Sequence, residues 1–362
     1  MSRQGPVPAP LRRDPIEPLR FEEALASLKE DVARRGGAVF VELLRESVLE
    51  NRHRCTLSLV PEPQLGGRLQ AAEEQELSAV RERLSAGELK ALEEETRALR
   101  AAQAARDDPA DLAKLPTLST SDLTASTKSI PIEVDEVAVA GGGRATLLTH
   151  ELPTDGLVYL NVGFDLARLP IDDVPYVPLL CRMMSELGTD TLDEVAFSRT
   201  VSAQTGSLGV STMTSAKPRP GGAAGSPDEA VAMLMLSGRA VADKAPQLFD
   251  LAADMLASTQ LDNAERAVAM LKQSLARAEA AVVSSGNSYA SAALAARFSL
   301  CGSVDEMLGG VSQLHTLRGA LEQAQSDWPA LLARLERMRS ALLSADGAVV
   351  NLSADEQSLA TT

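Results

Sequence analysis

The chain has 362 residues, 45% of them hydrophobic and only 3% aromatic, and its formal net charge at pH 7 is −15. This composition excludes a disordered chain, and the length is sufficient for two domains. We expect their cores to be aliphatic and largely helical. The acidity leaves no basic patch to bind a phosphate backbone, so we expect no nucleic-acid partner. An acidic surface suits basic partners, and the same charge can also serve solubility alone.

The cysteines and the apolar stretches bear on cellular location. Cys55, Cys181 and Cys301 are far apart and show neither a disulfide framework nor a zinc-binding spacing, which favours a reducing compartment. No run approaches the ~18 apolar residues of a membrane span, so we expect no membrane partner. The opening stretch MSRQGPVPAPLRRD is basic but broken by proline, so no targeting signal is evident; the signal is absent or lies upstream.

Residues 1–64 are predicted to be the C-terminal remnant of a preceding α/β unit. Apolar residues recur at helical spacing in 21–35 and 39–51, and Gly36-Gly37 separates the two helices. The stretch RCTLSLVPEP, residues 54–63, is typical of a strand that proline ends. Two helices and a strand without partner strands resemble the end of a domain, which indicates a fragment.

Residues 65–126 are predicted to form a helical hairpin and a linker. Two arms rich in Glu and Arg, 68–84 and 89–108, flank a capping box made by Ser85 and Glu88. We expect an antiparallel helix pair, although a solvated hairpin that only spaces two domains fits the same charges. The expected packing residues are Leu and Ala side chains, including Leu77, Val80, Leu84, Leu89, Leu92 and Leu99.

Residues 127–362 are predicted to form an α+β domain. Alternating apolar residues predict three antiparallel strands in meander order, at 130–140, 145–152 and 157–166. Further strands are expected at 207–215, 230–241 and 347–353. Helices are expected at 173–187, 192–205, 246–259, 263–283, 289–298, 304–323 and 328–343. This order predicts an antiparallel sheet with helices packed on one face, preceded by a long α-helical hairpin and a partial α/β unit.

The pair His150-Glu151 raises the question of a zinc peptidase. Such enzymes need HExxH or HxxEH on a helix, because positions i and i+4 place two imidazoles on one helical face. The pair is followed by Leu-Pro-Thr, so the second histidine is missing, and it ends a predicted strand. His53 and His315 have no second histidine at ligand spacing either. We therefore predict no metal ligand in this chain.

Nucleophilic and cofactor-binding sites are equally hard to find. The sequence has no GxSxG elbow, and AGGGR at 140–144 lacks the Lys-Ser/Thr of a phosphate loop, which favours a hairpin turn. His53 and Cys55 would share one strand face, but no acid or amide is evident to orient the histidine. We predict no catalytic and no cofactor-binding residue.

Several motifs, taken in order, resemble the presequence protease branch of the pitrilysin/insulysin peptidases, the inverted zincins. They span nearly the entire chain, and their order is more specific than any one of them. They are RDPIEPLRFEEALASLK with Ile16 in place of the family's Phe, HRCTLSLVPEP, the hairpin, PIEVDEV, THELPTDGLVYLNVGFDLARLP, LGTDTLDEVAF, TGSL, SGNSYASA and GGVSQLHTLRGAL.

The resemblance implies four related α/β units in two halves that close around a peptide. This chain would hold the end of unit two, the linker hairpin and the non-catalytic unit three. Zinc, bound by HxxEH and a distal Glu in unit one, would be a cofactor of the full-length enzyme and not of this chain. The catalytic half and basic or unstructured peptides would be its partners, in the mitochondrial matrix or the chloroplast stroma.

One helix of this chain corresponds to the zinc helix of unit one under that resemblance. Counting back from Gly188-Thr189 places Leu179, Arg182 and Met183 where His, Glu and His would stand. An aliphatic group, a cation and a thioether cannot replace two imidazoles and a carboxylate as zinc ligands. The helix would then survive only as scaffold.

Two hypotheses of function follow. In the first, the chain is a non-catalytic portion of a presequence-protease-like zinc metalloendopeptidase, which degrades targeting peptides and short unstructured peptides, and it supplies the hinge and a wall of the chamber. In the alternative, it is a free-standing inactive homologue that acts as a binding or assembly subunit. In both, the chain alone is predicted to be inactive. A third alternative is an independent enzyme whose mechanism the sequence does not show.

Overall fold

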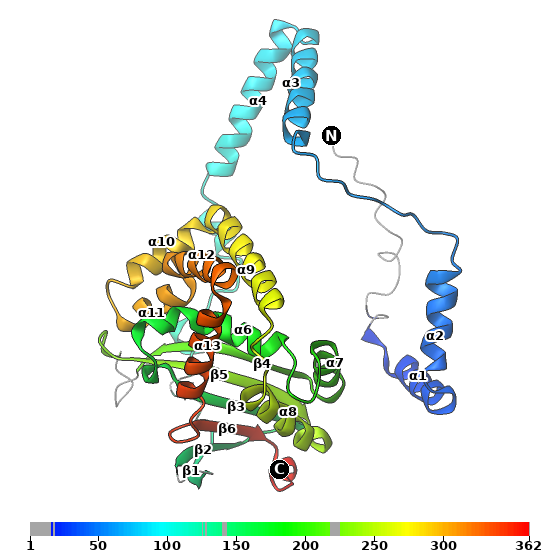
Figure 1. Ribbon diagram of the computed structural model, residues 1–362. Coiled ribbons are helices and arrows are strands. Elements are labelled where there is room, and N and C mark those ends of the chain that lie inside the picture. The colour runs from blue at the N-terminus through cyan, green and yellow to red at the C-terminus, as the bar shows by residue number, and fades with distance from the viewer. Residues whose placement is uncertain are drawn as a thin grey trace. The chain divides into compact units, whose positions relative to one another are not determined.

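The structure is a computed structural model, and it describes residues 16, 19–124, 126, 129–139, 143–217 and 225–361. It divides into two units, residues 1–120 and 121–362, so the boundary lies inside the predicted linker region (Figure 1). The turn predicted at 140–144 lies largely outside the described residues.

The described part of the first unit opens with two helices and contains no strand before the hairpin. Helix α1 spans Glu22–Arg35 and α2 spans Ala38–Leu44, continued by one π-helical turn at Arg45–Leu49. The strand predicted at 54–63 is wrong, because this segment lies extended without a neighbouring strand to accept its hydrogen bonds. Its apolar side chains remain in solvent, with Leu57 78% and Leu59 89% exposed.

The hairpin consists of α3, Leu65–Arg83, and α4, Ala86–Ala104. The predicted capping box is confirmed: the Glu88 amide donates to the Ser85 hydroxyl over 3.3 Å, and the Ser85 amide donates to the Glu88 carboxylate over 2.8 Å. The predicted leucine packing is wrong along the arms, since Leu77, Leu92 and Leu99 are 61%, 51% and 56% exposed. Leu84 and Leu89, which flank the turn, are half-buried. A short helix α5, Pro109–Leu112, and a 3-10 turn, Thr120–Asp122, follow.

The second unit is built on a mixed sheet of six strands. They are β1 Glu133–Ala138, β2 Arg144–Glu151, β3 Leu157–Asp165, β4 Ser207–Ala216, β5 Ala230–Val241 and β6 Val349–Ala354. The order across the sheet is β1-β2-β6-β3-β5-β4, and every neighbouring pair is antiparallel except β2 and β6.

The predicted meander through the first three strands is therefore wrong at one place. Strand β6 lies between β2 and β3, parallel to the first and antiparallel to the second. Residues 152–156 connect β2 to β3 across two interstrand spacings, about 10 Å in all. Alternation identified each strand, but the partner of β2 lies some two hundred residues away, beyond what a local pattern shows.

Helices fill the chain between these strands. They are α6 Val177–Glu186, α7 Glu194–Gln204, α8 Ala245–Ala257, α9 Ala264–Ser284, α10 Gly286–Ala295, α11 Leu300–Gly309, α12 Val311–Ser326, α13 Trp328–Leu342 and α14 Glu356–Leu359. Short 3-10 segments lie at Leu166–Arg168, Ile171–Tyr176 and Ala242–Lys244. Within the described ranges, no helix has both the length and the apolar character that crossing a membrane requires.

The single helix predicted at 304–323 is two helices, α11 and α12. The chain breaks at Gly310, where an added Cβ would lie 2.7 Å from the Glu306 carbonyl oxygen. The backbone turn between the two helices brings position 310 this close to Glu306, so only glycine fits there.

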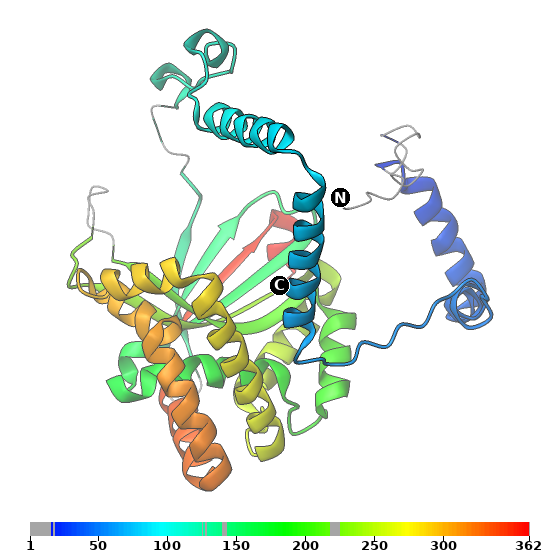
Figure 2. The same ribbon diagram turned by 90° about the horizontal axis from the view of Figure 1, so that it is seen from above.

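The helices cover one face of the sheet, as predicted for the α+β class (Figures 1 and 2). Alternate residues of the central strands point into this layer, including Leu160 and Phe164 of β3 and Leu234 and Leu236 of β5. They pack against α6, α8, α9, α12 and α13, each fully buried Leu contributing about 1.5–3 kcal/mol. The buried apolar residues of the described chain all come from this second unit.

Asp355 fixes the connection between β2 and β3 to the end of β6. Its carboxylate accepts from the amides of Ser358 at 2.9 Å and Gly156 at 2.7 Å, and from the Thr154 hydroxyl at 3.3 Å. The Ser358 hydroxyl first, then the amides of Ser358 and Gly156, lower the pKa of Asp355 from 3.8 to about 2. Hydrogen bonds to the charged form favour ionisation, so this carboxylate is held charged.

Limited proteolysis is expected to remove the first unit before the second. Residues 51–62 have no regular structure and no buried side chain, so a protease reaches them without prior unfolding. Trypsin at low concentration should leave a resistant fragment that begins near residue 129, detectable by mass spectrometry. Uniform resistance along the chain would contradict this and would mean that the first unit is covered.

Asp355→Asn is expected to lower the melting temperature at pH 7. The folded-state pKa lies below the unfolded value, so the stabilisation is present above about pH 4 and is lost as pH falls towards 2. The difference in melting temperature between wild type and variant should therefore shrink from pH 5 to pH 2. The control is Asp228→Asn, which removes an exposed carboxylate that takes no part in these hydrogen bonds. A difference for Asp355→Asn that is constant with pH would refute the role of the charge.

Candidate functional site

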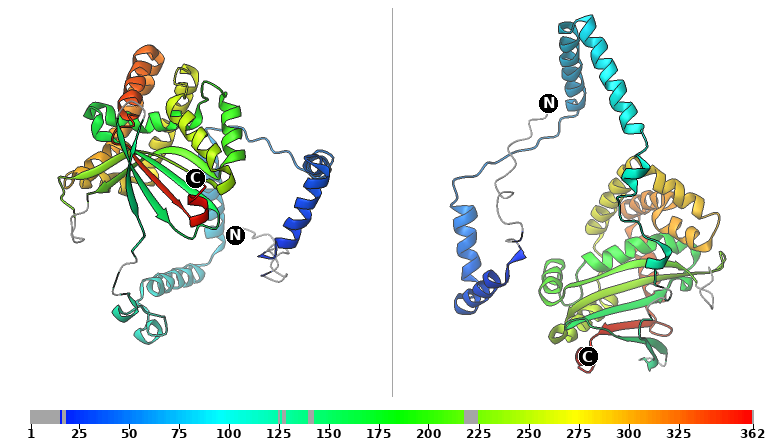
Figure 3. Two further views of the ribbon diagram at one scale, coloured as in Figure 1. Left: turned by 90° about the horizontal axis from the view of Figure 1, so that it is seen from below. Right: turned by 180° about the vertical axis from the view of Figure 1, so that it is seen from behind.

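The face of the sheet opposite the helices is open (left panel of Figure 3). The register places one row of side chains across it, from Leu148 of β2 through Asn351 and Asn161 to Ser237 of β5. A second row runs from Val349 through Gly163 to Met235. Successive side chains of a strand alternate between faces, so these residues are the counterparts of the buried core positions.

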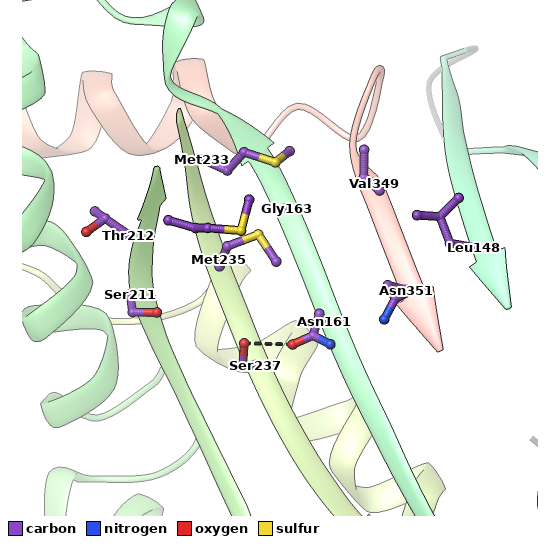
Figure 4. Close-up of a pocket in the computed structure, with 11 residues that line it drawn as sticks. Leu148, Asn161, Gly163, Ser211, Thr212, Met233, Met235, Ser237, Val349 and Asn351 are labelled. Atoms are coloured by element: carbon purple, nitrogen blue, oxygen red, sulfur yellow. Dashed lines mark hydrogen bonds between the residues drawn. The ribbon is translucent and has the colours of Figure 1, made fainter. Parts of the chain in front are cut away.

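A hollow of about 550 Å³ lies on this open face (Figure 4). Its lining residues are Leu148, Asn161, Gly163, Ser211, Thr212, Met213, Met233, Met235, Ser237, Val349 and Asn351. The volume falls in the ~300–1,000 Å³ range of small-molecule and side-chain pockets. We refer to it as the sheet hollow.

Gly163 lets two methionine side chains lie against strand β3 in the sheet hollow. A Cβ added there would lie 2.8 Å from the Met233 methyl group and 2.9 Å from the Met235 sulfur. The two methionine side chains therefore occupy the space that a side chain at position 163 would take. Because methionine has flexible torsions and a polarizable sulfur, this part of the wall can adapt its shape.

Polar groups lie beside the methionines. The Ser237 hydroxyl donates to Oδ1 of Asn161 over 2.8 Å (Figure 4). Asn351 is the register partner of Asn161 on the neighbouring strand. None of the lining residues is charged, so the overall acidity of the chain is not expressed in the sheet hollow.

His150 and Glu151 end strand β2, as the sequence predicted. Nδ1 of His150 donates to the Pro131 carbonyl over 2.7 Å, which ties the segment before β1 to β2. Glu151 is exposed. Throughout the part of the chain that the structure describes, no three His, Cys, Asp or Glu residues come close enough together to hold a metal ion.

Helix α6, which would correspond to a zinc helix, packs into the core instead. Leu179 is 5% exposed and Met183 is completely buried. Arg182 donates to the Met270 carbonyl at 2.8 Å, to the Ser274 hydroxyl at 2.7 Å and to Gln273, all on α9. It also pairs with Glu186 of its own helix at 2.7 Å. The three positions thus anchor α6 to the sheet and to α9.

The Gly188-Thr189 pair after α6 has a structural reason. A Cβ at Gly188 would lie 2.5 Å from the Leu192 carbonyl oxygen. Thr189 is 3% exposed; its amide donates to that carbonyl at 2.8 Å and its hydroxyl accepts from the Leu192 amide at 3.3 Å. The pair therefore closes a tight turn that needs no metal.

The other candidate side chains lie apart from the sheet hollow. His53 and Cys55 are exposed in the segment before α3, and His315 is exposed on α12. Cys181 is buried in α6, and burial raises the pKa of its thiol to about 12. The thiolate is the reactive form of cysteine, so Cys181 is an inert core residue.

Sequence reasoning missed the sheet hollow, but β5 carries a signal for it. The run AVAMLML is apolar at every position, whereas a strand with one face in water normally alternates apolar and polar residues. From Ser237 onward β5 does alternate, with Ser237 and Arg239 exposed and Gly238 and Ala240 buried. Apolar residues at consecutive positions therefore indicate that both faces of this part of β5 are apolar.

Comparison with known proteins places this chain among peptidase relatives. A family model for the region associated with subfamily C of the M16 peptidases matches residues 59–319. The chain is similar to presequence protease 1, chloroplastic/mitochondrial, of Arabidopsis thaliana, with 30% identity over 96% of this chain and 31% of that protein. Protein HypA of Clostridium perfringens is 25% identical over 82% of this chain and 29% of its own length.

A solved structure, the peptidase M16 inactive domain from Pseudomonas fluorescens, matches with a TM-score of 0.42 and 19% identity, over 63% of this chain and 48% of that one. The chain spans about a third of the length of the curated relatives above.

We expect the isolated chain to bind no zinc and to cleave no peptide. His150 is engaged with a backbone carbonyl, and positions 179, 182 and 183 offer no imidazole or carboxylate. The measurement is metal analysis of chelator-treated, zinc-reloaded protein together with a fluorogenic peptide assay. Stoichiometric zinc with a peptidase activity that His150→Ala abolishes, and that the exposed His315→Ala leaves intact, would overturn this.

Proposed function

The chain belongs to the family of regions associated with subfamily C of the M16 peptidases, and from this premise we propose that it is the non-catalytic portion of a presequence-protease-like zinc metalloendopeptidase. Zinc and the catalytic groups then belong to other parts of the full-length enzyme, and the catalytic half is the partner of this chain. The substrates are targeting peptides and other short unstructured peptides. The name of the Arabidopsis relative supports this substrate class.

The open face of the sheet is the observation that carries the proposal. A chamber wall needs an accessible surface with apolar contacts and hydrogen-bonding groups, and it needs no catalytic group. The sheet hollow offers methionine and aliphatic side chains beside two asparagines and two serines. We assign this face to the wall that contacts the peptide.

The helical hairpin is assigned to the hinge. Helices α3 and α4 have 19 residues each, so each is about 28 Å long at the α-helical rise. Their charged residues keep them soluble, while the exposed Leu77, Leu92 and Leu99 are available to contact a partner surface. Such a pair can connect two halves without filling a core of its own.

The proposed location is an organelle, either the mitochondrial matrix or the chloroplast stroma. The support is the name of the Arabidopsis relative, which is chloroplastic/mitochondrial. Subcellular fractionation with antibodies raised against this chain tests the location.

The native protein tests the proposed function. Antibodies against residues 225–361 should isolate a product well over twice the 38.2 kDa of this chain. That product should contain stoichiometric zinc and cleave an unstructured presequence peptide, and chelation should abolish the cleavage. A product near 38.2 kDa without zinc or activity would instead favour the free-standing inactive homologue that acts as a binding or assembly subunit.

A further inference from the structure

The apolar character of the open face is concentrated at the sheet hollow. On β5, Met233 and Met235 face the open side and are half-buried, while Leu234 and Leu236 between them are completely buried under the helices. Met213 of β4 is the register partner of Met233, and Val349 of β6 is the register partner of Gly163. Met233, Met235 and Val349 thus lie around a position that has no side chain, and Met213 extends the apolar surface on the far side of Met233.

Hydrogen-bonding groups border this apolar region on one side. Oδ1 of Asn161 accepts from the Ser237 hydroxyl, so the Nδ2 group of Asn161 takes no part in this hydrogen bond. Within the described ranges, no protein group hydrogen-bonds that Nδ2 group or the side-chain amide of Asn351. These amides can therefore donate to and accept from the backbone of an extended peptide, as exposed polar groups beside an apolar pocket commonly do.

The charges in and around the sheet hollow determine which side chains of a peptide it can bind. A charged group placed among the methionines would lose hydration, and no residue that lines the hollow is charged, so its partner would have to come from the margin. A carboxylate lies at the margin instead: exposed Asp165 is the register partner of Met233. The chain as a whole carries −15, so it attracts cationic peptides, while the uncharged lining of the hollow favours apolar side chains.

We propose that the sheet hollow binds apolar side chains of an amphipathic, basic peptide, so that leucine-type side chains supply the affinity and arginines only assist the approach. The proposal rests on the proposed function, because it specifies the substrate class of the same wall. The occupant is one stretch of unstructured peptide whose apolar side faces Met233, Met235 and Val349. Its basic side faces solvent and the acidic surroundings.

The test measures binding of fluorescein-labelled peptides to the complete chain by fluorescence anisotropy. One peptide alternates leucines and arginines, so that in an extended conformation the leucines share one side; a second has every leucine replaced by serine, and a third has every arginine replaced by glutamine. Loss of the leucines should weaken binding at least about tenfold, as expected from the loss of one or two buried leucines. Loss of the arginines should weaken it less, and that loss should vanish at about 0.5 M salt.

Variants locate the site. Met233→Ser with Met235→Ser should weaken the leucine peptide about tenfold and leave the serine peptide unchanged. Leu294→Ser is the matched control, because Leu294 is 58% exposed on α10, away from the sheet hollow. Gly163→Val is a second route: its side chain displaces only flexible methionine ends, so the strand is retained while the hollow is filled. Thermal unfolding confirms that each variant folds.

The outcomes separate the two proposals. An affinity that depends on the arginines, and that changes neither with the leucines nor with the variants, would overturn this inference. The proposal that this face contacts the peptide would remain. Failure of all three peptides to bind would overturn this inference, whereas the zinc content and peptidase activity of the native product decide the proposed function separately. Tenfold weakening by the methionine and glycine variants, with no effect of Leu294→Ser, establishes the sheet hollow as the site.

Discussion

The one-sided burial of the six-stranded sheet is the constraint on which the rest of the second unit depends. Because successive residues of a strand point to opposite faces, covering one face with helices divides the central strands β3 and β5 into core and open positions. Leu160, Phe164, Leu234 and Leu236 are core residues for this reason. The same geometry leaves Asn161, Gly163, Met233 and Met235 on the face that remains open. The core and the candidate site are therefore formed by alternate residues of the same strands.

The same constraint explains why α6 carries the residues it does. A helix lying on the sheet must present apolar side chains to it, and Leu179 and Met183 do so with almost no exposure. Arg182 projects sideways to α9, where it satisfies a main-chain carbonyl and a hydroxyl. A metal-binding version of this helix would have to satisfy imidazoles and a carboxylate in that layer, at the expense of these contacts. The helix and its closing Gly188-Thr189 turn therefore have a full structural explanation.

The first unit follows a different principle. Its helices α1 to α4 bury no residue among those described, and large side chains such as Phe40 and Leu44 are 52% and 53% exposed. Local signals alone, which are helix propensity, the capping box and charged surfaces, account for its secondary structure. Tertiary packing therefore adds little to this unit, in contrast to the second.

The sequence by itself determined the elements whose causes are local. The capping box at Ser85, the strands of the sheet and most of its helices follow from side chains within a few residues of one another, and so does the α+β class. The motifs also determined the family, because their order along the chain is a property of the sequence alone. Tertiary structure decided what depends on distant partners: the place of β6 between β2 and β3, the failure of residues 54–63 to form a strand, and the exposure of the hairpin leucines. It also decided the sheet hollow, since Leu148, Gly163, Met235 and Asn351 lie on four different strands, and only pairing brings them to one face.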